Sequence, residues 1–139
     1  MMTLKEFVKS YSGEKVDWDG HFGAQCVDLA RQYFHEVWNI PQPEGVEGAK
    51  DFFLLHEKRP IQNRYCYCQT YYPGMQPPDG AVVIFGENMT NRYGHIGICI
   101  RSDNDGVVLF EQDGFKQDGA KVVHWPYSRV LGWLLKKEV

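Results

Sequence analysis

One of the four cysteines, Cys26, stands where a glycine-containing turn gives way to a helical pattern, in the run Gly-Ala-Gln-Cys-Val-Asp-Leu-Ala at residues 23–30. This position predicts that its sulfur lies at the N-terminus of a helix. The unsatisfied amides of a first helical turn carry partial positive charge, which stabilises a thiolate relative to a thiol. The sequence therefore predicts a nucleophilic cysteine at this point of the chain.

A histidine and two carboxylates follow far downstream. His95 begins an alternating apolar pattern, and Glu111 and Asp113 end the next one. The turn cluster at residues 103–106 predicts a hairpin between the two patterns, with His95 near the strand end opposite Asp113. Alternate residues share one face of a strand, so either carboxylate could orient the imidazole. Cysteine, histidine and carboxylate together predict a thiol hydrolase that cleaves an acyl bond.

An acidic segment precedes the cysteine and overlaps it. Five of its residues fall at places one, three, five, seven and twelve of a loop, which is the spacing of calcium ligands in an EF-hand: Asp17, Asp19, His21, Gly23 and Asp28. The segment is not an EF-hand, because Phe22 occupies the place of the required glycine. Three carboxylates on one short loop repel each other without a cation, so we expect Ca²⁺ here. The alternative is an acidic turn that only caps the helix.

Composition excludes several classes of protein. The chain has 139 residues, and its 43% hydrophobic and 24% charged residues are typical of one globular domain spanning residues 1–139. A formal charge of −3 argues against a nucleic-acid partner. No apolar stretch is long enough for membrane insertion, and the first residues lack the apolar core of a secretory signal. We therefore expect synthesis in the cytoplasm.

The other three cysteines are predicted to be free thiols without a disulfide or metal role. Cys66 and Cys68 are too close in an extended chain to form an unstrained bridge, and their spacing does not suit a zinc site. Cys99 alternates with isoleucines and is predicted to be a small core residue.

The order of the patterns predicts an α+β fold, with a helical first half and a strand-rich second half. Apolar spacing predicts helices over residues 1–11, 27–38 and 48–55. The stretch from 56 to 78 is predicted to be mostly loop, with one strand around 65–71. Further strands are expected at 81–85, 95–101, 106–112, 120–125 and 131–135, all in one antiparallel sheet.

Several of these motifs occur together in a known family. The chain resembles the CHAP domains, the cysteine- and histidine-dependent amidohydrolases and peptidases of bacterial and phage cell-wall lysis. The resemblance rests on Gln-Cys-Val-Asp-Leu at 25–29, Pro-Asp-Gly-Ala-Val-Val at 78–83, Gly-His-Ile-Gly-Ile at 94–98, Phe-Glu-Gln at 110–112 and the closing Gly-Trp at 132–133. It implies a papain-like fold, with helices packed on one antiparallel sheet.

The resemblance also implies roles for the site residues. Cys26 would be the nucleophile, His95 the general base and Glu111 the residue that orients the histidine. Many phage members have asparagine where this chain has Asp113, and an amide donates where a carboxylate only accepts. Gln25, with the backbone amide of Cys26, would bind the oxyanion, as in papain-like enzymes.

A calcium site and a substrate follow from the same resemblance. Related staphylococcal phage domains bind Ca²⁺ through carboxylates at the places of Asp17, Asp19 and Asp28 and through backbone carbonyls at those of His21 and Gly23. The implied substrate is bacterial peptidoglycan, cut after release of the enzyme at a peptide bond of the stem or cross-bridge. The alternatives are cleavage of the lactyl amide as an N-acetylmuramoyl-L-alanine amidase, an intracellular thiol peptidase, and a wall-binding module without turnover. A separate wall-binding domain or subunit is expected in the parent protein.

Overall fold

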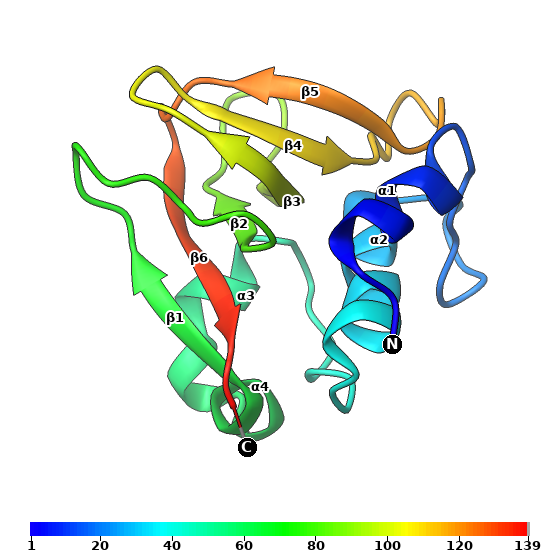
Figure 1. Ribbon diagram of the computed structural model, residues 1–139, viewed down its shortest axis with the longest axis horizontal. Coiled ribbons are helices and arrows are strands. Elements are labelled where there is room, and N and C mark those ends of the chain that lie inside the picture. The colour runs from blue at the N-terminus through cyan, green and yellow to red at the C-terminus, as the bar shows by residue number, and fades with distance from the viewer. Residues whose placement is uncertain (139) are drawn as a thin grey trace.

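Alternating apolar residues form one curved sheet, seen in a computed structural model that describes residues 1–138 (Figure 1). All neighbouring strands run antiparallel, in the order β1-β6-β2-β3-β4-β5. The strands are β1 (Cys66–Thr70), β2 (Val82–Phe85), β3 (His95–Ser102), β4 (Val107–Glu111), β5 (Lys121–Trp125) and β6 (Val130–Lys136). The strands predicted from the alternating patterns are confirmed within a residue or two at each end.

Helices formed by the first half of the chain lie against this sheet. They are α1 (Leu4–Tyr11), α2 (Cys26–Tyr33), the π-helical turn η1 (Phe34–Trp38), α3 (Asp51–Leu54), the 3₁₀ turn η2 (His56–Lys58) and α4 (Pro60–Tyr65). Figure 1 shows α1 and α2 packed together beside the sheet, with α3 and α4 near the end where β6 finishes. The predicted α+β layout is confirmed.

The two faces of the sheet bury different sets of apolar side chains. One face packs against α1 and α2 and includes Val82, Ile84, Ile96, Ile98 and Phe110. The opposite face forms a second cluster from the alternate residues, among them Val83, Phe85, Cys99, Leu109 and Trp133. Cys99 is a buried core residue, as predicted, and all four cysteines are free.

Two local predictions need correction. The helix expected over residues 27–38 changes to a π-turn at Phe34, and Asn39 ends it in the left-handed region that asparagine tolerates. The stretch predicted to be mostly loop contains η2 and α4. Pro60 supplies a fixed φ at the first position of α4, and buried Gln62 donates to the carbonyl of Phe52, so this short helix depends on contacts distant in sequence.

Among residues 1–138, no helix is both long enough and apolar enough to cross a bilayer.

Candidate active site

Cys26 is the first residue of α2, which confirms its predicted place at a helix N-terminus. Gln25 precedes it in extended conformation as the N-cap residue. Buried Asp28 accepts a hydrogen bond from the backbone N–H of Gln25 at 3.0 Å, which fixes the chain at the start of the helix. The sulfur of half-buried Cys26 is therefore held beside the positive end of the helix dipole.

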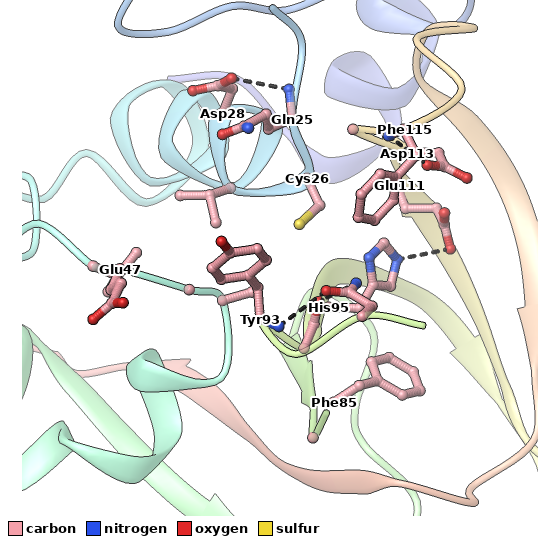
Figure 2. Close-up of a pocket in the computed structure, with 18 of the residues that line it drawn as sticks. Gln25, Cys26, Asp28, Glu47, Phe85, Tyr93, His95, Glu111, Asp113 and Phe115 are labelled. Carbon is pink, nitrogen blue, oxygen red and sulfur yellow. Dashed lines mark hydrogen bonds and ion pairs between the residues drawn. The ribbon is translucent and has the colours of Figure 1, made fainter. Parts of the chain in front are cut away.

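His95 begins β3 and faces the cysteine. Figure 2 shows the Cys26 sulfur and the His95 imidazole pointing toward one another across the pocket. On the far side of the ring, Nε2 lies 3.1 Å from Oε1 of Glu111, which is only 3% exposed. The N–H of Nε2 is not aimed at this oxygen, so the contact is an ion pair by distance and not an aligned hydrogen bond. The three side chains thus form one row, from thiol to imidazole to carboxylate.

The sheet register explains why Glu111 reaches the histidine. Ile98 pairs with Phe110, so Gly97 stands opposite Glu111, and His95 is its diagonal neighbour on the same face. A Cβ atom at Gly97 would lie 3.3 Å from the Cβ of Glu111. The absence of a side chain at this position leaves room for the carboxylate to turn toward His95.

The surroundings of His95 and of the other three cysteines shift their pKa values in ways that matter for the chemistry. Burial alone lowers the pKa of an imidazole, but the close contacts with the Cys26 thiol and the Glu111 carboxylate outweigh it and raise the pKa of His95 to about 10. Burial raises the pKa of the Cys66 and Cys99 thiols to about 12 and that of Cys68 to about 11. These three thiols are therefore poor nucleophiles at neutral pH.

Asp113, the other carboxylate that the sequence left open, does not contact the histidine. Its Oδ1 accepts hydrogen bonds from the backbone N–H groups of Phe115 and Lys116 at 2.8 and 3.2 Å. It caps the turn that follows β4 and lies on the wall of the same pocket. The structure brings Glu111, and not Asp113, beside His95.

Two glutamines that the sequence reasoning missed join this turn to the segment before Cys26. Buried Gln112 accepts from the N–H of Val16 at 2.7 Å and donates to the carbonyls of Val16 and Gln25 at 2.9 and 2.8 Å. Gln117 accepts from the N–H of Ala24 at 2.9 Å and donates to its carbonyl. The only sequence signal was the position of Gln112 directly after Glu111, which does not reveal its distant partners.

A groove of about 1090 Å³ runs past the three side chains. Its walls carry unusually exposed aromatic residues, with Phe22 at 86% and Phe115 at 74% exposure, and Tyr93 also lines it. Gln25 is exposed on the same wall, next to Cys26. The groove is therefore open to a large substrate and presents flat apolar surfaces on either side of the sulfur.

The acidic residues before Cys26 also converge. One carboxylate oxygen from each of Asp17, Asp19 and Asp28 lies within 4.8 Å of the others. Burial, together with the charges of Asp19 and Asp17, raises the pKa of Asp28 to about 6, although its bond from Gln25 acts in the opposite direction. Three converging carboxylates supply the hard oxygen donors that suit a divalent cation such as Ca²⁺. His21 and Gly23 have no side-chain oxygen, so their predicted contribution is through backbone carbonyls.

Comparison with known proteins agrees with this geometry. The family model of the CHAP domain matches residues 15–113, which include Cys26, His95, Glu111 and Asp113. The chain is 31% identical over 123 residues to the endolysin PlyTW of Staphylococcus phage Twort (strain DSM 17442 / HER 48). That match covers 81% of this chain and 24% of the relative, so the chain spans about a quarter of that protein's length.

Solved structures share the fold. The wild-type endolysin LysIME-EF1 superposes with a TM-score of 0.68 at 20% identity, covering 97% of this chain and 64% of that one. The structure of Ly7917 gives a TM-score of 0.69 at 17% identity, covering 94% of this chain and 60% of that one. The helices and six-stranded antiparallel sheet are thus the papain-like α+β arrangement expected from the sequence.

Proposed function

Since the chain belongs to the CHAP domain family, we propose that it is a peptidoglycan hydrolase that cleaves an amide bond by a cysteine mechanism. The row formed by Cys26, His95 and Glu111 in an open groove carries this proposal. The similarity to the phage endolysin PlyTW supports the choice of bacterial cell wall as substrate. An intracellular thiol peptidase would use the same three groups, so the substrate must be tested directly.

The reaction follows from the chemistry of the three side chains. His95 takes the thiol proton of Cys26, and the thiolate attacks the amide carbon to form a tetrahedral oxyanion. As this intermediate collapses, the imidazolium protonates the leaving amine and the C–N bond breaks, leaving a thioester on Cys26. Water then gives its proton to His95 and attacks the thioester, which releases the acid and restores the thiol. Glu111 holds the imidazole and stabilises its positive charge in both steps.

The oxyanion needs donors next to the sulfur. The backbone N–H of Cys26 is in the first turn of α2, where it has no partner within the helix, and the amide of Gln25 is exposed on the same wall. We assign both groups to the oxyanion. Loss of one such donor costs about 3 to 4 kcal/mol of barrier in other acyl-transfer enzymes, so Gln25→Ala is expected to slow hydrolysis by about 100-fold or more.

We propose that the bond cut is a peptide bond of the stem or cross-bridge. The groove is at least as large as pockets that hold drug-sized ligands, and its aromatic walls suit an extended peptide lying past Cys26. Cleavage of the lactyl amide between muramic acid and the stem is the alternative outcome. The two produce different fragments: the first leaves a new amine and a new carboxylate within the peptide, whereas the second frees the amine of the stem L-alanine and the lactyl carboxylate of muramic acid.

We further propose that Ca²⁺ supports the active conformation. The carboxylates of Asp17, Asp19 and Asp28 would hold it, and the backbone carbonyls of His21 and Gly23 complete the proposed ligand set. A bound cation would offset the negative charge of the loop and fix the turn that leads into Cys26. Its contribution is to structure and local charge, and the bond-breaking steps use Cys26 and His95.

A wall-binding domain or subunit is proposed as a partner that concentrates the enzyme on its insoluble substrate. The matched region makes up only 24% of PlyTW, which supports a multi-part parent protein. Action on the wall would follow release of the protein from the cell in which it is made.

Zymography separates the two substrate classes. Purified bacterial walls and a soluble protein such as casein are embedded in parallel gels, and wild type is run beside Cys26→Ser. We expect clearing of walls by wild type alone and no clearing of casein. Clearing of casein without clearing of walls would favour the intracellular peptidase.

A further inference from the structure

Trp125, the last residue of β5, touches both members of the acid–base pair. Its indole Nε1 donates a hydrogen bond to Oε1 of Glu111, the same oxygen that lies 3.1 Å from Nε2 of His95. The ring centroids of Trp125 and His95 are 5.7 Å apart, with planes inclined by 50°. A single indole therefore contacts the carboxylate through its edge and the imidazole through its ring.

The hydrogen bond matters because the carboxylate is otherwise held weakly. Within residues 1–138, the Trp125 N–H is the only directed hydrogen bond that the Glu111 side chain accepts. The contact with His95 is not aligned with the N–H of Nε2 and so does not by itself fix the rotation of the carboxylate. An indole N–H has one direction and no acceptor function, so it can hold an anion in one orientation.

The Trp125 ring also packs around the contact between Glu111 and His95. Phe85 lies 5.8 Å from both the Trp125 and the His95 ring centroids, so the three rings enclose the pair. Both residues line the groove, where Trp125 is 37% exposed and Glu111 only 3% exposed. The indole is thus the solvent-exposed partner of a carboxylate that is itself almost fully covered.

We propose that Trp125 is a positioning residue that holds the Glu111 carboxylate against His95 and shields their contact from water. This inference rests on the proposed function, because it assigns Trp125 to the same acid–base pair. A freely rotating carboxylate would spend time away from the imidazole, which would lose its one anionic partner on that side.

The test isolates the Glu111–His95 contact from the thiol. In a Cys26→Ala background, NMR titration of the His95 ring reports the effect of the carboxylate alone. Adding Trp125→Phe keeps an aromatic ring and removes the N–H, and we expect the pKa of His95 to fall by about one unit, a tenfold change in proton affinity. The other charged groups near Glu111, which are Lys121 opposite it on β5 and Asp113 beyond β4, are unchanged by this substitution.

Trp133→Phe is the matched control. Trp133 is 2% exposed in the second hydrophobic cluster, and its indole makes no hydrogen bond within the described part of the chain. Trp133→Phe removes the same atoms as Trp125→Phe, but away from Glu111. The pKa of His95 should therefore stay as in the Cys26→Ala protein. An equal fall in both variants, or no fall with Trp125→Phe, would overturn the proposal.

Activity provides a second reading with Cys26 restored. We expect Trp125→Phe to lower the initial rate of wall lysis about tenfold, and to have no further effect when Glu111→Gln is already present. Additive losses in the double variant would overturn the proposal. If wild type lyses no walls, the proposed function fails, while the His95 titration still decides the role of Trp125.

A measurement on the wild type covers the case in which Trp125→Phe does not fold. The Trp125 indole N–H, assigned through bonds, should resonate downfield of the other indoles and exchange slowly despite the exposed ring. Glu111→Gln should move it upfield. A fast-exchanging signal that ignores Glu111→Gln would show that the bond does not persist in solution and would overturn the proposal.

Discussion

Replacing Gln112 by methionine should destabilise the protein strongly, although the side chain changes little in size. Gln112 is 1% exposed and hydrogen-bonds to the N–H and carbonyl of buried Val16 and to the partly buried carbonyl of Gln25. Methionine fills a similar volume, so the cavity contribution is small. The cost is therefore mainly that of leaving the two Val16 groups without partners, at about 1 to 3 kcal/mol each, because the Gln25 carbonyl still accepts from the N–H of Asp28.

We expect the free energy of unfolding to fall by about 2 to 6 kcal/mol, out of the roughly 5 to 15 kcal/mol typical of a domain. Urea unfolding followed by tryptophan fluorescence measures this change. Gln76→Met is the control, because Gln76 is exposed and bonds only to exposed Asn104, and its effect should stay within about 0.5 kcal/mol.

Gln112→Met should also lower the catalytic rate of the molecules that remain folded. Removing one of the two hydrogen bonds that the Gln25 carbonyl accepts loosens the residue next to the nucleophile, so the lysis rate per folded molecule should also fall. A Gln112→Met protein that unfolds within about 1 kcal/mol of wild type would refute the view that this side chain joins the Cys26 segment to the end of β4.

Four further results are expected. Glu111→Gln should slow wall lysis more than Asp113→Asn, because only Glu111 lies at 3.1 Å from His95, and the reverse order would move the orienting role to Asp113. The pKa of His95 is raised from 6.5 to about 10 in the folded protein, so its contribution to stability is complete below pH 6.5 and is lost as the pH rises toward 10. Urea unfolding at several pH values should show that the free energy of unfolding declines in wild type and declines less in His95→Gln. Equal declines in the two proteins would contradict this role of His95. Chelation should lower both the melting temperature and the lysis rate, with Ca²⁺ restoring them better than Mg²⁺, and Asp19→Ala should no longer respond to Ca²⁺. Iodoacetamide at pH 6 should modify Cys26 before Cys66, Cys68 and Cys99, and equal modification of all four would argue against an activated thiolate.

Much of this arrangement could be predicted because its signals are local. The start of α2 at Cys26 follows from the preceding glycine turn and the apolar spacing after it, and strand alternation located β2 to β6. Acidic residues at 17, 19 and 28 could be grouped because they lie within one short segment.

Other parts depend on contacts that no local pattern encodes. The choice between Glu111 and Asp113 depends on the register of β3 and β4, which shifts at an irregularity between Cys99 and Arg101. Helix α4 was missed because six residues give too little periodicity, and its stability comes from buried Gln62. Trp125 pairs with Val107 in the sheet and not with Glu111, so its hydrogen bond to that carboxylate depends on the direction of a long side chain, which residue types do not reveal.

The central claim is that Cys26 opens an amide bond of peptidoglycan, and mass spectrometry of the muropeptides released from purified walls tests it most directly. Wild type and Cys26→Ser, both checked for folding by circular dichroism, are incubated with the same walls. We predict that wild type releases fragments with a new amine and carboxylate at one peptide bond, and that Cys26→Ser releases none. Fragments cut only at sugar linkages, or equal release by folded Cys26→Ser, would contradict the account.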